Sequence, residues 1–303
     1  LNNRRVIGSG LNEQEEEIRL AALQSLFDSR PERGLKLALE IIKPDSGESS
    51  RMKEGAITLI ADHGGPQAIP ALIEAARGPD PVLRRRAVQM LGSIEDDRAI
   101  DFLIELVSKP ADRETAFQAI NSIGDHESAR ARIALLQIAR SNPNPELRKH
   151  AIMRIGDRDD EASTDELLQL FESEKSPDIR RSIISALSNS DSPRARAKIL
   201  EIARTSDDPE VRRRAIDAIG DREDEAAVDA LIQMYDAEKD ESLKEKIIDA
   251  LGDTERKRAL GKLMDIVRSN TSARLKKRAI SVLGQSDDPE ASRFLEDLLK
   301  KND

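Results

Sequence analysis

Apolar residues along this chain recur in short groups with the three- and four-residue spacing of amphipathic helices. One group reads Ala-Ile-x-x-Ile-Gly with close variants. Its last residue falls at positions 92, 124, 156, 188, 220, 252 and 284, in steps of 32 residues. Looser copies end at Ala61 and Phe27. We name this recurring element helix B and predict nine copies of it.

A second apolar group, which we name helix A, lies between successive B copies, as in Phe102 to Val107 and Leu231 to Tyr235. Asp80 and Asp208 each precede a proline, which predicts an N-cap followed by the first helical residue. The glycines that close helix B, such as Gly220, are expected to adopt the left-handed conformation that ends many helices. No segment alternates with period two for long enough to predict a strand.

These patterns predict an all-α solenoid of about 18 antiparallel helices with a 32-residue period. One helix pair is too small to bury its own apolar face, so neighbouring pairs must stack. We expect an irregular segment over residues 1–12 and a single array of about nine helix pairs over residues 13–303. The series opens with helix B and closes with helix A, which favours a fragment of a longer chain.

The block from Asp208 to Gly220, Asp-Pro-Glu-Val-Arg-Arg-Arg-Ala-Ile-x-x-Ile-Gly, resembles a HEAT repeat. It is most similar to the short bacterial form that also occurs in phycobilisome lyases, and the resemblance extends from about residue 13 to residue 301. It implies a right-handed, armadillo-like superhelix whose B helices line a concave face. It also implies protein–protein contact as the usual role, whereas it transfers no catalytic residues.

The amino-acid composition limits which catalytic and metal sites the chain can contain. The chain has no cysteine, three histidines and 2% aromatic residues. Thiol catalysis and cysteine-ligated zinc are therefore excluded, and a multi-histidine metal site is disfavoured. His126 and Glu127 form one His-Glu pair in a predicted turn, where we expect Glu127 to be a capping residue and His126 to be incidental. We find no phosphate-binding glycine loop or nucleophile motif, and we predict no catalytic residue, metal or cofactor.

Helix B carries a basic column three residues before the repeat alanine, at the edge of the apolar sector. Its best-placed members are Arg84, Arg148, Arg180 and Arg212, with the turn acids Asp80 and Asp208 nearby. A cation at the edge of a core must be paired or reach solvent. We interpret the column as an ion-pair ladder between adjacent repeats, with an anion site as the alternative.

The positions two residues before and after the repeat alanine lie opposite the core and are expected to face the groove. The predicted groove residues are Arg85, Gln89, Phe117, Asn121, Lys149, Met153, Arg181, Ser185, Arg213 and Asp217. This set is basic in its middle although the chain has a net charge of −9. We therefore expect the acidic excess on the turns and the A helices. Phe117 and Met153 form a candidate apolar hot spot, unless a rotated repeat buries Phe117.

The resulting hypothesis is a non-catalytic scaffold that binds a peptide or protein surface of acidic character, because a cationic lining attracts anions. A solvated polar face is the alternative reading of the groove. The alternative functions are nucleic-acid binding, which the net charge opposes, and an accessory or lyase-like role. No apolar run is long enough to span a membrane. The absence of cysteine and a first residue other than Met favour an exported or periplasmic bacterial protein.

Overall fold

Eighteen α-helices and one short 3₁₀ helix make up most of the described chain, and no strand occurs in that part. The computed structural model describes residues 4–109, 112–158, 160–222, 224–254 and 256–300. Even-numbered helices are type A and odd-numbered helices are type B. The all-α prediction is therefore confirmed. Contacts divide the chain into two units, residues 1–155 and 156–303, and each is described by itself.

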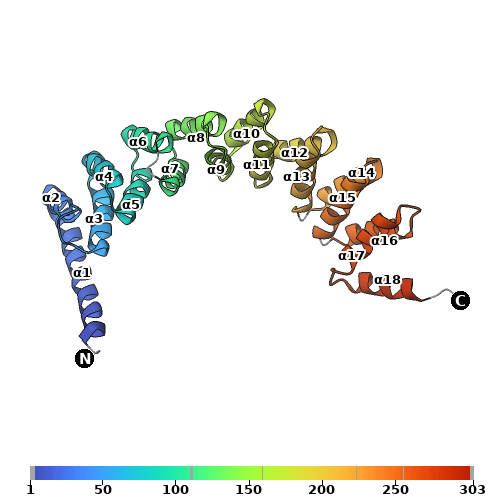
Figure 1. Cartoon of the computed structure of the whole chain (residues 1–303), viewed down its shortest axis with the longest axis horizontal. Helices are drawn as coiled ribbons and strands as arrows, with labels where there is room; N and C mark the ends of the chain where they lie inside the picture. The colour runs from blue at the N-terminus through green and yellow to red at the C-terminus, as the bar shows by residue number, and fades with distance from the viewer. Residues whose placement is uncertain (1–3, 110–111, 159, 223, 255, 301–303) are drawn as a thin grey trace. The chain divides into compact units, whose positions relative to one another are not determined.

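The first unit is built from nine helices, of which the last ends one residue past the division. They are α1 (Arg4–Ser29), α2 (Pro31–Ile41), α3 (Ser50–His63), α4 (Ala68–Arg77), α5 (Pro81–Gly92), α6 (Asp97–Ser108), α7 (Arg113–Asp125), α8 (Ala129–Ser141) and α9 (Pro145–Gly156). The 3₁₀ helix η1 (Gly65–Gln67) precedes α4. In Figure 1, α4, α6 and α8 lie in one row, and α3, α5, α7 and α9 lie in the other.

The second unit repeats this alternation. Its helices are α10 (Glu161–Ser173), α11 (Pro177–Ser188), α12 (Pro193–Thr205), α13 (Pro209–Gly220), α14 (Glu225–Ala237), α15 (Glu241–Asp253), α16 (Lys257–Arg268), α17 (Ala273–Leu283) and α18 (Pro289–Leu299). The repeat alanines and their apolar neighbours are buried, as Ala215, Ile216 and Ile219 show in α13. The predicted helix-B periodicity therefore marks the core.

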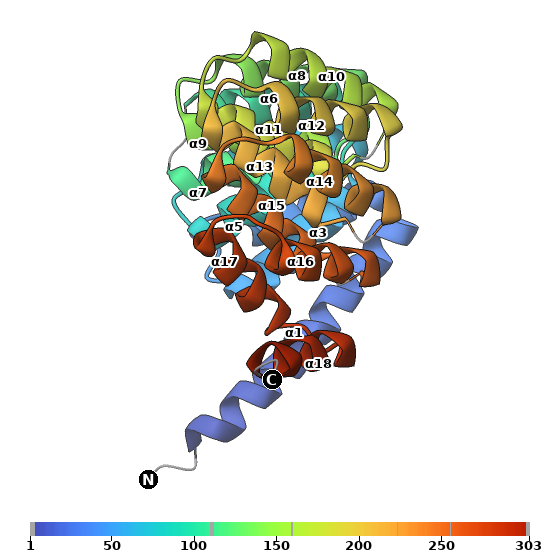
Figure 2. The same cartoon turned by 90° about the vertical axis from the view of Figure 1, so that its right-hand side faces the viewer.

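Helix α1 begins at Arg4, so the expected irregular segment is helical over residues 4–12, and residues 1–3 lie outside the described chain. Both views show the N-terminal part of α1 continuing beyond the helices packed on its C-terminal half (Figures 1 and 2). The expectation of a single array over residues 13–303 stays a prediction.

The glycines that close helix B do not adopt the predicted left-handed conformation. Within the described residues, only Gly47 and Gly65 have positive φ. Instead, the B-helix glycines allow close packing: a Cβ atom on Gly220 would lie 2.8 Å from the Cβ of Ala250 in the next B helix. The prediction was wrong because glycine suits both a left-handed turn and a close helix contact, and only the second is realised here.

The A helices are not uniformly acidic, which corrects the expected distribution of charge. Acidic residues outnumber basic ones in α6, α10 and α14, and the reverse holds in α8, α12 and α16. Ion pairs join each acidic helix to the basic A helix that follows it. These pairs are Asp101–Arg130, Asp165–Arg194, Asp229–Arg258, Glu172–Lys198 and Asp236–Lys262. Glu105 of α6 also pairs with Arg77 of the preceding helix α4 at 3.1 Å, so these contacts connect successive A helices within each unit.

Candidate functional site: the helix-B face

Two of the predicted ladder arginines, Arg84 and Arg212, connect adjacent repeats, each through an acid that follows in the next repeat. Arg84 donates to the carbonyl oxygen of Gly78 at 3.0 Å and pairs with Asp112 of the next repeat at 2.9 Å. Arg212 donates to the carbonyl of Ala203 at 3.2 Å and pairs with Glu238. These arginines satisfy the carbonyl groups at the end of the preceding A helix and then reach the following repeat, as a C-terminal cation should.

The remaining ladder residues have local roles. Arg148 donates to the carbonyl of Ala139 at 2.9 Å. The guanidinium of Arg180 lies 4.2 Å from the centroid of the Phe171 ring, a cation–π contact. Asp80 and Asp208 are N-caps that accept backbone N–H groups of their own helices, and neither forms an ion pair within 4.0 Å in the described chain. Arg84 and Arg212 thus link adjacent repeats, as the ladder interpretation requires.

The pKa of Asp112 reflects its place in this ladder. The backbone N–H and the hydroxyl of Thr115 both donate to its carboxylate, at 2.7 and 2.8 Å, and Arg84 adds a positive charge beside it. These contacts hold the pKa of Asp112 below its usual value.

A second ladder of contacts, which the sequence analysis did not predict, connects a B helix to the next B helix in each unit. The residue just before the repeat alanine contacts the residue two places after the alanine of the preceding repeat. The pairs are Arg86–Thr58, His150–Asn121, Arg214–Ser185, Lys246–Asp217 and Arg278–Asp249. The recurring 28- or 29-residue separation was the signal that could have revealed it. Asn121, Ser185 and Asp217 of the predicted groove are therefore engaged within the array.

In the second unit the predicted groove cations are neutralised by acids one turn earlier in the same helix. Arg181 pairs with Asp178, and Arg213 pairs with Glu210 at 2.5 Å. Arg213 also donates to the hydroxyl of Ser242 at 2.7 Å. The basic character expected from the sequence is therefore weak on this part of the helix-B face.

In the first unit three cations of α5 and α7 have no acidic partner at short range among the described residues. Arg86 donates to Thr58 Oγ1 at 2.9 Å and to Gln89 Oε1 at 2.9 Å. The guanidinium of Arg113 lies 5.2 Å from the centroid of the Phe117 ring. Arg85 is exposed. Within the described residues, no carboxylate lies within 4.0 Å of a charged atom of these arginines, so their positive charge is uncompensated at short range.

Phe117 is half-buried on this face, and neither sequence alternative described it fully. Its ring meets the His150 ring edge-on, with 4.8 Å between centroids, so the residue is neither in the core nor isolated. Met153 is also half-buried on α9, and Lys149 pairs with Glu146 at 3.0 Å. We name the set Arg85, Arg86, Arg113, Phe117 and Lys149 the α5–α9 patch.

A cavity of about 120 Å³ adjoins this patch between α5 and α7. Its lining combines Arg85, Val88, Glu114, Thr115 and Gln118 with neighbouring ladder residues. The site therefore offers a shallow recess beside an exposed arginine, a size that accommodates one side chain of a partner.

The described residues contain no group of three or more His, Asp or Glu side chains placed to hold a metal ion. His126 is buried, and its Nδ1 accepts the backbone N–H of Ser128 at 3.1 Å. Its Nε2 therefore carries the proton and donates to the carbonyl of Ile94 at 3.1 Å. His126 therefore connects two turns, whereas the sequence predicted an incidental histidine beside a capping Glu127; the N-cap of α8 is Ser128. No helix in the described chain is long and apolar enough to cross a membrane.

A family model described as HEAT repeats matches residues 45–124, 133–220, 197–281 and 228–303. The chain is also similar to solved structures of Kap95p with RanGDP (12% identity, TM-score 0.53, covering 92% of this chain and 44% of that one). A Kap95 complex with Nup1 gives 12% identity and a TM-score of 0.55, covering 93% and 46% of the two chains. The chain thus spans less than half of either neighbour.

The complex of CpcE and CpcF of phycocyanin lyase from Nostoc sp. PCC7120 is 19% identical, with a TM-score of 0.34 over 82% of this chain and 92% of that one. No curated protein matches the sequence. At such low identity the Kap95 structures establish the fold alone, and they agree with the helix-pair architecture described above.

Proposed function

This chain belongs to the HEAT-repeat family, and from that premise we propose that it is a non-catalytic scaffold that binds an acidic segment of another protein. The binding surface in this proposal is the α5–α9 patch of the first unit. The observation that carries it is the difference between the two parts of the helix-B face. Arg181 and Arg213 have acids one turn earlier. Arg86 and Arg113 contact neutral groups, and Arg85 is exposed.

Uncompensated arginines raise the local positive potential and speed encounter with an anionic partner. Phe117 supplies an aromatic anchor at the centre of this charge, flanked by Arg113 and His150. Arginine and aromatic residues dominate the energetics of protein interfaces, especially when they lie together in a recess. The patch therefore suits a segment that presents carboxylates around one apolar side chain.

The aromatic content and the charge of the chain make the alternative functions less favourable. In this patch the described chain offers one half-buried aromatic ring, that of Phe117, whereas binding of single-stranded nucleic acid uses successive stacked bases. The net charge of −9 opposes a phosphate backbone. Among the described residues of this face, we find no acid, base and nucleophile grouped as an enzyme active site requires.

Fluorescence anisotropy with a short labelled peptide of Asp, Glu and Leu tests the proposal. Arg85→Glu combined with Arg113→Glu should weaken binding at least tenfold, and Phe117→Ala alone should weaken it several-fold. The matched control is Arg181→Glu combined with Arg213→Glu, which reverses the same number of charges on the second unit. We expect the control to change the affinity by less than about threefold.

A peptide in which Lys replaces Asp and Glu serves as the charge control, and a single-stranded oligonucleotide serves as the phosphate control. Equal losses in both double variants would place binding elsewhere on the helix-B face. Tighter binding of the oligonucleotide than of the acidic peptide would overturn the proposed partner class.

A further inference from the structure

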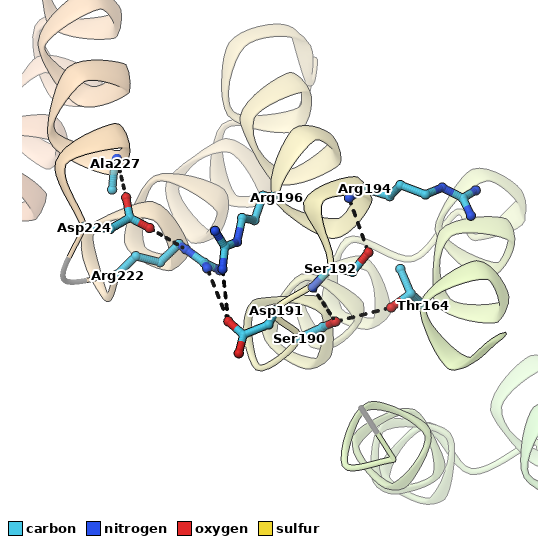
Figure 3. A network of polar contacts seen from close by, with 9 residues as sticks. All are labelled: Thr164, Ser190, Asp191, Ser192, Arg194, Arg196, Arg222, Asp224 and Ala227. Carbon is cyan, nitrogen blue, oxygen red and sulfur yellow. Dashed lines mark hydrogen bonds and ion pairs between the residues drawn. The ribbon is translucent and has the colours of Figure 1, made fainter. Parts of the chain in front are cut away.

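Two arginines of the second unit converge on one carboxylate near the turn that precedes α12. Arg196 comes from the first turns of α12, and Arg222 comes from the turn between α13 and α14 (Figure 3). Arg196 Nη2 lies 3.0 Å from Asp191 Oδ1, and Arg222 Nη2 lies 3.7 Å from the same oxygen. The carboxylate thus occupies the position toward which both guanidinium groups point.

Arg222 is held more firmly than the acid beside it, whereas the side chain of Arg196 is 42% exposed. The side chain of Asp191 is 90% exposed, whereas that of Arg222 is 17% exposed. Arg222 is fixed from its other side by Asp224, which also caps α14 by accepting the N–H of Ala227 at 2.7 Å. A solvent-exposed ion pair contributes little to stability, so an external anion can replace Asp191 at small cost.

An apolar cavity of about 70 Å³ opens beside these guanidinium groups. Its walls are formed by aliphatic side chains from three helices. They are Ile199, Leu200, Ile219, Ala226 and Ala227. Arg196, Arg222 and Asp224 complete the lining. Arg196 Nε is buried, and no hydrogen-bond acceptor contacts it among the described residues.

From this arrangement we propose that the cavity binds a carboxylate that carries a small aliphatic group, with Asp191 as the internal group that it displaces. The ligand carboxylate would accept hydrogen bonds from Arg196 and Arg222, since guanidinium groups match carboxylates in shape and charge. Its aliphatic group would fill the cavity. A free short-chain acid and the C-terminal residue of a peptide share this chemistry, and the site is separate from the α5–α9 patch.

Isothermal titration calorimetry on the whole chain, with isovalerate and with an acetylated dipeptide ending in valine as probes, tests this site. Arg222→Gln should weaken binding at least tenfold, and Asp191→Asn should strengthen it several-fold because the competing carboxylate is removed. Ala226→Leu, a change at an exposed position, should fill the cavity and reduce affinity for both probes to that of acetate.

The matched control is Arg194→Gln on the same helix. Its side chain points away from Arg196 and pairs with Asp165, so its loss should leave affinity unchanged (Figure 3). Tighter binding of the dipeptide than of isovalerate identifies a peptide terminus, and the reverse identifies a free acid. Three control ligands are the C-terminal amide of the dipeptide, acetate and inorganic phosphate. The proposal is overturned if any of them binds as tightly as the two probes or more tightly. It is also overturned if Arg194→Gln and Arg222→Gln lose the same affinity.

Discussion

The B-helix glycines provide a sharp test of how these repeats pack. A Cβ atom on Gly220 would lie 2.8 Å from Ala250 Cβ, 3.0 Å from Ala250 Cα and 3.1 Å from its carbonyl oxygen. Two of these atoms belong to the backbone of α15, so no rotamer change relieves the clash. We therefore predict that Gly220→Ala destabilises the second unit, although alanine is the better helix former.

The magnitude follows from two opposing terms. Overpacking a close contact costs about 1–3 kcal/mol, and replacing glycine by alanine within a helix recovers about 0.5–1 kcal/mol. Taking the midpoints of the two ranges, the net expected loss is about 1 kcal/mol. Gly261 in α16 is the matched control because a Cβ atom there meets nothing within 4 Å. Gly261→Ala should therefore stabilise the unit by about 0.5–1 kcal/mol.

Urea unfolding followed by circular dichroism and by tyrosine fluorescence measures both effects. Tyr235, the single tyrosine of the chain, is buried in α14 of the same unit and reports on it locally. A third variant separates the two explanations of Gly220. A left-handed glycine tolerates asparagine better than alanine, whereas a packing glycine tolerates the larger residue less well. Greater stability of Gly220→Asn than of Gly220→Ala would refute the packing argument.

Three further outcomes are expected from individual contacts. The side chain and backbone N–H of Arg98 lower the pKa of Asp96 from 3.8 to about 2. The stability that Asp96 contributes is therefore present above pH 4 and is lost as the pH falls through 2. An NMR titration of the Asp96 carboxyl group checks this, and a midpoint near pH 4 would contradict it. Arg212→Gln should cost about 1–3 kcal/mol in urea unfolding because it leaves buried partners unpaired, whereas Arg213→Gln should cost less than about 0.5 kcal/mol; equal costs would argue against the ladder. His126→Leu should lower the stability of the first unit by about 1–3 kcal/mol, read from hydrogen exchange of its amides, since two backbone groups lose their buried partner.

Local signals in the sequence predicted the helices well. Asp208 before Pro209 marks the start of α13, and the structure shows Asp208 accepting two backbone N–H groups there. Such caps are decided within four residues of chain, so a sequence pattern contains them completely. The HEAT-repeat resemblance and the buried face of helix B are confirmed for the same reason, because period and burial are both properties of one helix.

Contacts between repeats were harder to predict. The sequence predicted a ladder between adjacent repeats with turn acids as partners, but it did not specify which repeat supplies each acid, and Arg84 reaches Asp112 in the next repeat. The sequence predicted a basic groove at Arg181 and Arg213 because the pattern describes each helix position separately. Their neutralising acids occupy a different column of the same helix, so the charge of this surface depends on side-chain reach as well as on the face that each residue occupies.

The alternation of acidic and basic A helices shows that the ion pairs repeat over a longer stretch of sequence than the apolar core does. Asp165 pairs with Arg194, and 32 residues after Arg194 stands Ala226, whereas 64 residues after it stands Arg258, which is itself paired with an acid. The apolar core therefore repeats every 32 residues, but the ion pairs between A helices repeat every 64. A shift of one helix pair would preserve the core and lose these ion pairs, whereas a shift of two pairs would preserve both. The electrostatics thus specify the order of helix pairs that the hydrophobic pattern alone leaves undetermined.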